Sequence, residues 1–190
     1  MAEKLSETDK TELLKIARDA ISSAVKGQPL EKINLDSFSA KLQADGASFV
    51  TLTKERKLRG CIGALEAFQP LVMDVQEHAI AAAQEDFRFN PVSINEIESL
   101  KIEISRLTPL QKLDFEDNND LISKLRPGID GVLLKDGIRR ATFLPQVWDQ
   151  ISNGQDFLSH LCMKMGALPD LWQKKHLDVY IYQVEEFKED

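Results

Sequence analysis

The first clear pattern along the chain is a stripe of apolar residues at helical spacing. Apolar side chains recur three and four positions apart, which puts them on one face of an α-helix: Leu13, Ile16, Ala17, Ala20, Ile21 and Ala24. Ser6 is placed to cap the first turn, with Asp9 three residues later. Gly27 and Pro29 end the pattern. The stripe therefore predicts a helix that packs its apolar face against a core.

The pattern changes to alternation after the turn signal Asp45-Gly46. Residues 47–53 and 58–65 both alternate between apolar and polar side chains, as strands with one buried face do. The charged segment 54–57 separates them and is typical of a turn. The two segments therefore predict a β-hairpin whose return strand begins at Leu58.

Further strands and helices follow without strict alternation. Strands are expected at 101–107 and 177–184, and a second hairpin at 132–134 and 138–144; helices are expected at 70–84, 93–99, 121–125, 145–151 and 154–165. Residues 35–42 fit either a short helix or a weak strand. There is no glycine fingerprint between a strand and a helix, so a Rossmann-like parallel sheet is disfavoured. The predicted fold is α+β, with a mainly antiparallel sheet and helices packed around it.

Length and composition are those of an ordinary globular protein. The 190 residues, 43% hydrophobic and 29% charged, fit one domain over 1–190, or one domain with two lobes. No apolar run approaches the ~20 residues of a membrane span, and the N-terminus lacks the apolar core of a secretory signal. We therefore expect a cytoplasmic protein with no membrane partner. In that compartment Cys61 and Cys162 are expected as free thiols.

Charge and histidine spacing narrow the classes of partner. The net charge of −7 argues against a nucleic-acid binder, whose surface is usually basic. A weaker RNA-binding alternative rests on the local basic residues Arg56, Lys57 and Arg59. The three histidines are scattered, and no pair of residues has the spacing of a zinc site, so the sequence predicts neither a metal nor a cofactor.

The most informative segment is Leu58-Arg59-Gly60-Cys61-Ile62-Gly63. Strict alternation along a strand would put Arg59, Cys61 and Gly63 on one face. Gly60 and Gly63 weaken a strand by roughly 0.5–1 kcal/mol each against alanine, so some gain should offset them. Two explanations stay open: a bulge that bends the sheet, or a ligand or another backbone that comes close to the glycines. The segment therefore indicates a site without naming a reaction.

Several side chains could supply chemistry around this segment. Cys61 is a candidate nucleophile, with Arg59 as a cation beside it and His78 as a base, although a buried cysteine and a packing histidine are common structural residues. Asp86 and Arg88 could bind a polar ligand, or could tie their loop to the body by a salt bridge. The candidate ligand-binding set is Arg59, Gly60, Cys61, Gly63, Asp86, Arg88 and Arg140.

These segments together resemble the AMMECR domain family. The hexapeptide 58–63 matches the family's hallmark, and 81–91 resembles its Ala-rich helix end followed by an Asp-x-Arg-Phe loop. Residues 128–131, 139–148 and 158–172 resemble later blocks, and the chain is most similar to the stand-alone bacterial type, protein A of the AmmeMemoRadiSam system. One departure is Phe87, where the family pattern has proline.

The resemblance implies a fold, a location for the site and a set of partners. It implies an α+β fold of two lobes, with the hexapeptide near a cleft between them, and a functional link to a Memo-type protein and a radical-SAM enzyme. The family has no established biochemical activity. Our first hypothesis is an accessory protein that holds a small molecule, or a partner's flexible segment, over Arg59 and Cys61. The second is an enzyme with Cys61 as nucleophile, Arg59 as anion contact, and His78 or Asp86 as base. The oligomeric state is not predicted.

Overall fold

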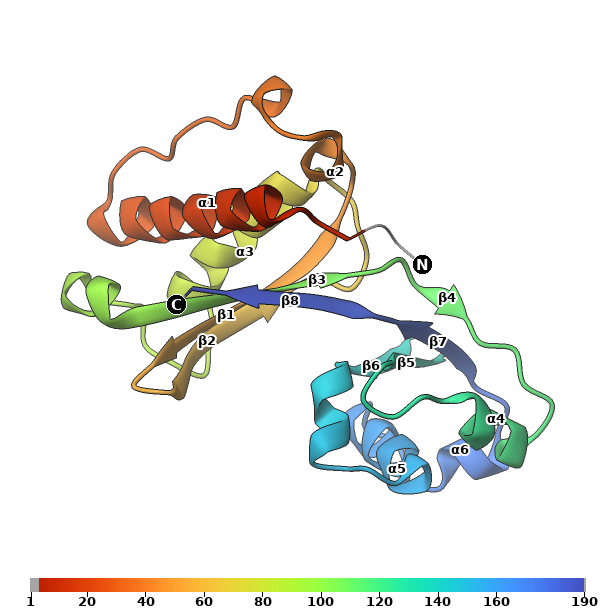
Figure 1. The fold of residues 1–190 in the computed structure, drawn as a ribbon. Coiled ribbons are helices and arrows are strands. Elements are labelled where there is room, and N and C mark those ends of the chain that lie inside the picture. The colour runs from red at the N-terminus through yellow and green to blue at the C-terminus, as the bar shows by residue number, and fades with distance from the viewer. Residues whose placement is uncertain (1–3, 190) are drawn as a thin grey trace. The chain divides into compact units, whose positions relative to one another are not determined.

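The computed structural model describes residues 4–189 and divides the chain into two compact units. The first unit consists of Met1–Thr108 together with Glu185–Asp190, and the second of Pro109–Val184. The second unit is therefore an insertion in the sequence of the first. Each unit contains its own four-stranded sheet and its own apolar core (Figure 1).

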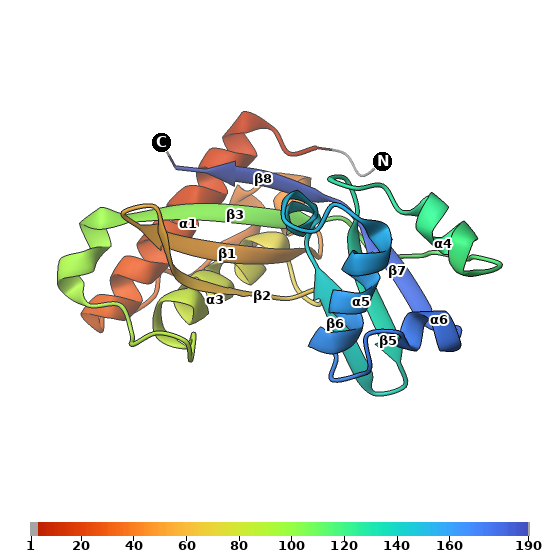
Figure 2. The same cartoon turned by 90° about the horizontal axis from the view of Figure 1, so that it is seen from below.

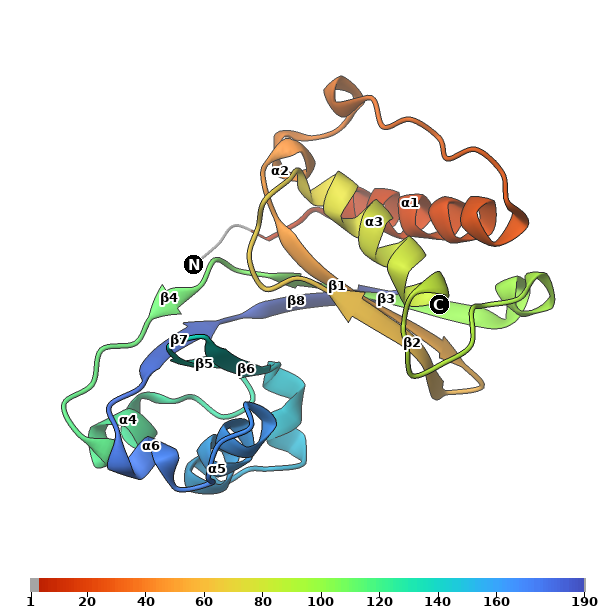
Figure 3. The same ribbon diagram turned by 180° about the vertical axis from the view of Figure 1, so that it is seen from behind.

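The first unit is a sheet with helices on one face. Its strands have the order β2-β1-β3-β8. The elements are α1 (Glu7–Lys26), η1 (Leu35–Ser37), α2 (Ala40–Gln43), β1 (Ala47–Lys54), β2 (Lys57–Gly63), α3 (Leu71–Gln84), η2 (Ile94–Ser99), β3 (Leu100–Leu107) and β8 (Val184–Lys188). Helices α1 and α3 lie on the same side of this sheet (Figures 1 and 3). Seen from below, the four strands lie in front of these two helices (Figure 2).

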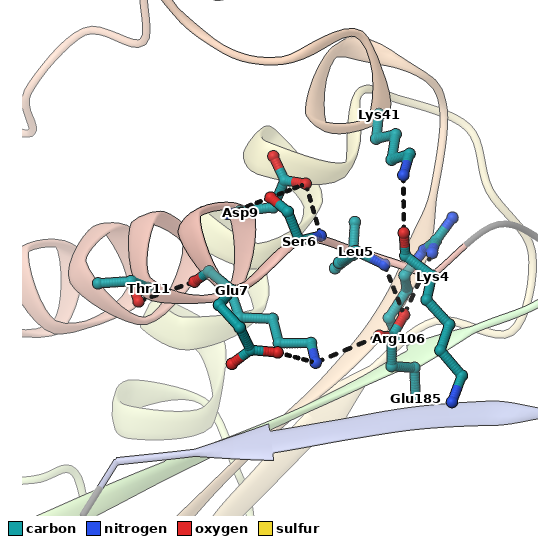
Figure 4. A network of polar contacts seen from close by, with 10 residues as sticks. Lys4, Leu5, Ser6, Glu7, Asp9, Thr11, Lys41, Arg106 and Glu185 are labelled. Atoms are coloured by element: carbon teal, nitrogen blue, oxygen red, sulfur yellow. Dashed lines mark hydrogen bonds and ion pairs between the residues drawn. The ribbon is translucent and has the colours of Figure 1, made fainter.

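Helix α1 begins and ends where the sequence predicts. Ser6 and Asp9 form a reciprocal capping box, and Gly27 ends the helix in the left-handed region with φ 64°. The start of the helix is also bound to the sheet, because the Leu5 amide donates to Glu185 of β8 at 3.2 Å (Figure 4). Glu185 lies 3.4 Å from Arg106 of β3 as well. These contacts hold the start of α1 against β8 and β3.

The hairpin of β1 and β2 carries a tight turn and a bulge. Glu55 and Arg56 have φ of 52° and 63°, the left-handed pair that a two-residue type I′ turn requires. Beyond the turn, Thr53 pairs with Leu58 but Leu52 pairs with Gly60. One residue of β2, Arg59, is therefore left over in the pairing, which is the definition of a β-bulge.

The two faces of this sheet differ in what they contact. Val50, Leu52, Ile102 and Ile104 are fully buried and belong to the core shared with α1 and α3. Because side chains alternate along a strand, the residues between them, such as Thr51 and Glu103, lie on the opposite face. We call this second face, which no helix of the first unit covers, the open face (Figure 2).

The second unit has the strand order β4-β7-β5-β6. Its elements are β4 (Gln111–Lys112), α4 (Asn118–Lys124), β5 (Gly131–Asp136), β6 (Arg139–Phe143), η3 (Pro145–Asp149), α5 (Gly154–Lys164), α6 (Leu171–Lys174) and β7 (Asp178–Tyr182). Trp148 and Trp172, each 3% exposed, are core residues. The Trp148 ring stacks on Phe157 with centroids 3.7 Å apart.

The predicted α+β class is confirmed, and every pairing with a described register is antiparallel. Residues 35–42 form short helical turns, one of the two alternatives that the sequence left open. The helices expected at 93–99 and 145–151 are 3₁₀-helices, Ile94–Ser99 and Pro145–Asp149. The expected last strand 177–184 ends at Tyr182, and the chain then enters β8 in the sheet of the first unit. The structure therefore has two separate sheets where the sequence predicted one. The cleft expected between two lobes stays a prediction.

Candidate functional site

Strand β2 is an edge strand, and its outward main chain at Cys61 is held by side chains. The Cys61 amide donates to Asp86 Oδ2 at 2.8 Å, and Arg88 Nη2 donates to the Cys61 carbonyl at 3.2 Å. Arg88 also forms a fork on Asp86, with Nε 2.9 Å from Oδ1 and Nη2 2.7 Å from Oδ2. The ion pair therefore binds both polar groups that a further strand would otherwise bind.

The ion pair shifts the pKa values of both of its members. Hydrogen bonds from Arg88 hold the pKa of Asp86 well below its usual range, and the hydrogen bond from the Cys61 N–H adds to this, although burial acts in the opposite direction. Asp86 in turn raises the pKa of Arg88 through its hydrogen bonds and its charge. The guanidinium of Arg88 is held at Cys61 by its hydrogen bond to the Cys61 carbonyl. The salt bridge lies within the loop, and hydrogen bonds to the Cys61 main chain tie the loop to β2. A ligand role for Asp86 and Arg88 stays a prediction.

Arg59 is bound to a second carboxylate. Its Nε and Nη2 each lie 3.0 Å from Glu96, one on each oxygen, and Nη2 also donates to the Pro91 carbonyl at 3.3 Å. Lys54 Nζ lies 3.2 Å from the same carboxylate, and the Ser93 amide donates to it at 3.0 Å. These bonds, that of Arg59 foremost, keep the pKa of Glu96 well below its usual range. RNA binding through Arg59 gains no support from this pairing.

The bulge corrects the expected arrangement of the hexapeptide. Strict alternation placed Arg59 beside Cys61, but Arg59 is the extra residue of the bulge, where alternation fails. The guanidinium goes to Glu96 and Pro91, whereas the Cys61 Sγ lies 3.3 Å from the Thr51 hydroxyl on β1. The cation bound to Cys61, through its carbonyl, is therefore Arg88 and not Arg59. Both guanidinium groups lie over the Phe89 ring, at 6.0 Å for Arg59 and 5.6 Å for Arg88.

The two glycines accommodate protein atoms. A Cβ on Gly60 would lie 2.1 Å from the Ala82 carbonyl oxygen of α3, and a Cβ on Gly63 would lie 2.3 Å from the Ser48 carbonyl oxygen. The same Cβ on Gly63 would lie 2.5 Å from the Phe49 ring. The close approach of backbone, together with the bulge, thus explains why these positions are glycine. A ligand that used the Cys61 amide would have to displace Asp86.

His78 lies on the opposite face of the sheet from the thiol. It is 7% exposed on α3, and its Nδ1 is 3.2 Å from Asp74 Oδ2, which also accepts from the Ser48 hydroxyl at 2.6 Å. Ser48 has the same parity along β1 as Val50, so it faces the helices, whereas Cys61 is paired with Thr51 on the open face. This placement argues against the expected pairing of His78 with Cys61.

Other expected residues are placed as follows. Arg140 is exposed on β6 in the second unit, so any ligand role for it stays a prediction. Both cysteines are free thiols; Cys162 is buried and Cys61 is partly exposed. Sequence reasoning missed Thr51 and Glu96. Thr51 would have emerged from the hairpin register only with knowledge of the bulge, and Glu96 was recognised as a capping residue but not as the partner of Arg59.

Three further observations concern hollows, metals and membranes. One hollow of about 300 Å³ lies beside α1 and is lined by Ile16, Asp19, Ala20, Ser22, Ser23, Pro29, Glu31 and Gln76, none of which belongs to the candidate site. Within residues 4–189, no three histidine, cysteine or acidic side chains come together as metal ligands would. No helix in the same part of the chain is both long and apolar enough to cross a membrane.

Comparison with known proteins identifies the family. The model of the AMMECR1 family matches residues 14–187, nearly the whole chain. The chain belongs to the AMMECR1 family. It is 36% identical to Protein MK0488 of Methanopyrus kandleri, over 100% of this chain and 93% of that protein. It is 38% identical to a protein of Methanothermobacter thermautotrophicus, over 98% of this chain and 97% of the other.

A solved structure has the same fold. The crystal structure of the uncharacterized protein PH0010 from Pyrococcus horikoshii matches with a TM-score of 0.89 at 31% identity, over 99% of this chain and 95% of that one. These relatives are archaeal, so they establish the AMMECR1 family without establishing the bacterial type that the sequence resembles.

Proposed function

We propose that this AMMECR1-family protein is an accessory protein that binds a flexible segment of a partner at the edge of β2. The partners are a Memo-type protein and a radical-SAM enzyme, the proteins with which the family resemblance associates the chain. The observation that supports this proposal most is the exposure of the loop bound to Cys61. Phe87, between Asp86 and Arg88, is 94% exposed although the residues on either side of it are held in place.

The surface around this loop has the composition of a binding surface. Leu58 and Ile94 are 45% and 60% exposed, and the Arg88 side chain is 44% exposed. We call Leu58, Phe87, Arg88 and Ile94 the edge-loop surface. Aromatic residues and arginine are enriched in protein interfaces, and exposed apolar groups beside them are typical of binding sites. Arg56 and Lys57 are also exposed in the adjoining turn. A partner segment with apolar and acidic residues therefore fits this surface.

The test is co-purification of the full chain with each partner at micromolar concentration. Phe87→Ser is expected to weaken binding at least about tenfold, since single aromatic anchors contribute 2 kcal/mol or more to many interfaces. Phe68→Ser is the matched control, because Phe68 is also aromatic and 62% exposed but lies outside the edge-loop surface. Failure of the wild-type chain to co-purify with either partner, or equal loss in both variants, would contradict the proposal.

A second candidate function is catalysis with Cys61 as nucleophile. The observation in its favour is that Cys61 is partly exposed, that its carbonyl accepts from Arg88 at 3.2 Å, and that its Sγ lies 3.3 Å from the Thr51 hydroxyl. A thiol near a fixed cation and a polar partner fits a reactive cysteine. The test is the rate of alkylation of Cys61 against pH. A rate no faster than that of free cysteine at neutral pH would exclude the nucleophile role.

A further inference from the structure

The hollow of about 300 Å³ in the first unit is bounded by α1, by the segment that follows it, and by α3. We call it the α1 hollow. Its volume is at the lower end of the range for small-molecule sites. Its lining comes from the two helices and the segment between α1 and α2, and none of it from β2 or the loop that binds Cys61. The α1 hollow is therefore separate from the edge-loop surface.

Two contacts hold the wall of the α1 hollow that faces the helices. After the left-handed Gly27, the Gln28 amide donates to the Ser23 carbonyl at 2.9 Å, and the chain then runs back along α1 toward α2 (Figure 1). Farther along, Gln76 Nε2 of α3 donates to the Glu31 carbonyl at 3.2 Å. Residues 28–31 are therefore tied to both helices, and the hollow is formed by the fold itself, as ligand sites usually are.

The charged groups of the lining are two carboxylates, Asp19 of α1 and Glu31 of the following segment, and no basic side chain belongs to it. Among residues 4–189, no donor of the protein binds either carboxylate. Asp86 and Glu96 differ in this respect, because an arginine binds each of them. Asp19 is only partly exposed, and a carboxylate that loses water without gaining a donor is destabilised. A cationic ligand would supply that donor.

The basic residues closest in sequence to these carboxylates do not neutralise them. Arg18 is bound to Glu189 and to main-chain carbonyls. Lys15, one turn before Asp19, and Lys32, next to Glu31, are exposed and form no ion pair with them in the part of the chain that the structure describes. The α1 hollow therefore keeps its negative charge.

The rest of the lining suits a ligand that has N–H donors and a hydrocarbon part. The hydroxyls of Ser22 and Ser23 and the side-chain oxygen of Gln76 can accept hydrogen bonds. Ile16 and Ala20 add apolar surface, and Ala20 is 3% exposed. A hard metal ion fits less well, because it takes six or more oxygen ligands, and no three acidic, histidine or cysteine side chains of residues 4–189 converge.

We propose that the α1 hollow binds a small aliphatic amine. Its ammonium group donates to the carboxylates of Asp19 and Glu31, and its hydrocarbon chain lies on Ile16 and Ala20. Charge-assisted N–H bonds to carboxylates are about twice as strong as neutral ones, so the two acids provide most of the selectivity for a cation. This site is independent of the function proposed for the edge-loop surface.

The probe is putrescine, a diamine with a four-carbon chain, titrated into the full chain by calorimetry. Butanediol has the same chain length without the charge. Putrescine is expected to bind with a Kd of about 1 mM or lower, which a ligand of its size can reach, and butanediol is expected not to saturate. Nitrogen-15 NMR locates the site, because putrescine should shift the side-chain amide signals of Gln76 and the main-chain amides of Ser22 and Ser23.

Three variants test the residues of the hollow. Asp19→Asn is expected to weaken putrescine binding about five- to tenfold, and Glu31→Gln, whose carboxylate is more exposed, about threefold. Ser22→Leu keeps every charge but narrows the hollow, so it should weaken binding about tenfold through steric exclusion. Glu12→Gln is the matched control, because Glu12 is also a partly exposed carboxylate of α1 but lies outside the lining, and its affinity should change less than about twofold.

Several outcomes overturn the proposal. These are the absence of saturable putrescine binding, equal affinity for butanediol, or unchanged affinity in Asp19→Asn. Equal weakening in Glu12→Gln would show general attraction to an acidic surface and would overturn the site as well. If Mg²⁺ displaces putrescine and itself loses affinity in Asp19→Asn, the hollow binds a metal ion and the assignment to an amine is wrong. Co-purification through the edge-loop surface should be the same in all four variants, so failure of one proposal is distinguishable from failure of the other.

Discussion

Gly60 illustrates at the residue scale how one position can be fixed by a neighbour's backbone. Any side chain there would meet the Ala82 carbonyl oxygen at 2.1 Å, and that oxygen belongs to a helix held by the whole core. A backbone atom cannot rotate away as the end of a side chain can. Gly60 therefore allows α3 to lie close against β2, and the glycine is explained by packing between two elements.

We expect Gly60→Ala to lower the free energy of unfolding by about 1–3 kcal/mol, the usual cost of overpacking. Gly154→Ala is the matched control, since its Cβ would lie 3.3 Å from the end of the Ile122 side chain, which can move. The control should change stability by less than about 0.5 kcal/mol. Urea denaturation of both variants makes the comparison, and equal effects would contradict this account of Gly60.

Tyr182 gives the second residue-scale prediction. Burial raises the pKa of its phenol from 10.0 to about 12, while the Thr142 hydroxyl lies 2.7 Å away and acts against that rise. A group whose pKa is higher in the folded state adds stability that is complete below its ordinary pKa and is lost as pH rises through the folded value. The stabilisation should therefore disappear between pH 10.0 and about 12.

Tyr182→Phe provides the comparison. At neutral pH the variant should be less stable by about 0.5–1.5 kcal/mol, because the Phe143 carbonyl loses the hydroxyl that donates to it at 3.2 Å. As the pH rises from about 9 to about 11.5, the wild-type chain should lose more stability than the variant, so the difference between them shrinks. Thermal denaturation followed by circular dichroism measures this, and a constant difference would contradict the expectation.

At the scale of elements, the hairpin of β1 and β2 is built on an unfavourable turn. Glu55 and Arg56 both occupy the left-handed region, which costs an L-residue roughly 1–2 kcal/mol. The flanking strands are held on one side by β3 and on the other by Asp86 and Glu96, so the hairpin keeps its geometry despite this cost. Stability here comes from the neighbours of the turn and not from the turn itself.

Arg56→Gly is accordingly expected to raise the free energy of unfolding by up to about 1 kcal/mol, since glycine tolerates positive φ. Arg56→Ala serves as its control, because it removes the same side chain but keeps a Cβ at φ 63°. Chemical denaturation of the two variants separates backbone strain from loss of the arginine. A glycine variant no more stable than the alanine variant would contradict the role of strain.

The fold was predictable from sequence where local signals are strong. The stripe of α1, its caps and both hairpins follow from periodicity and turn chemistry, and all are present. A bulge was one of two explanations for the glycines, but its position was not predictable, because one extra residue leaves no mark on the pattern of apolar positions. That position moved Arg59 away from Cys61. The pairing of Asp86 with Cys61 depends on tertiary contact between a loop and an edge strand. The family resemblance was visible in the sequence because it depends on the order of motifs. The pairing of Thr51 with Glu103 was not visible there, because it depends on the register of β1 and β3.

At the scale of the whole molecule, the main surprise of the fold is β8. Residues 184–188 contain only two apolar side chains among charged ones, so they carry no strong strand signal. They nevertheless form the last strand of the first sheet, next to β3, where the Glu189 amide donates to the Ile102 carbonyl at 3.0 Å. Arg18 of α1 makes a fork on Glu189 and also donates to the Ile97 and Leu100 carbonyls, both at 2.9 Å.

Removal of residues 184–190 should therefore destabilise the first unit and spare the second. We expect faster hydrogen exchange throughout β3 in the truncated chain, most of all at the Ile102 amide, which donates to Glu189 at 3.0 Å. Amides of β5 in the second unit should keep their protection, because their partners on β6 and β7 are still present. Glu189→Gln is a milder variant that tests the ion pair alone, and equal loss of protection in both units of the truncated chain would contradict this division.

The insertion of the second unit also fixes an order of events on the ribosome. Synthesis runs from the N-terminus, so residues 109–183 are made after β3 and before β8, the strand that completes the first sheet. Until β8 is made, the margin of β3 that it binds remains open, and Arg18 lacks the carboxylate of Glu189. The first sheet is therefore unfinished while the second unit is synthesised, and an unpaired strand edge of this kind is what chaperones protect.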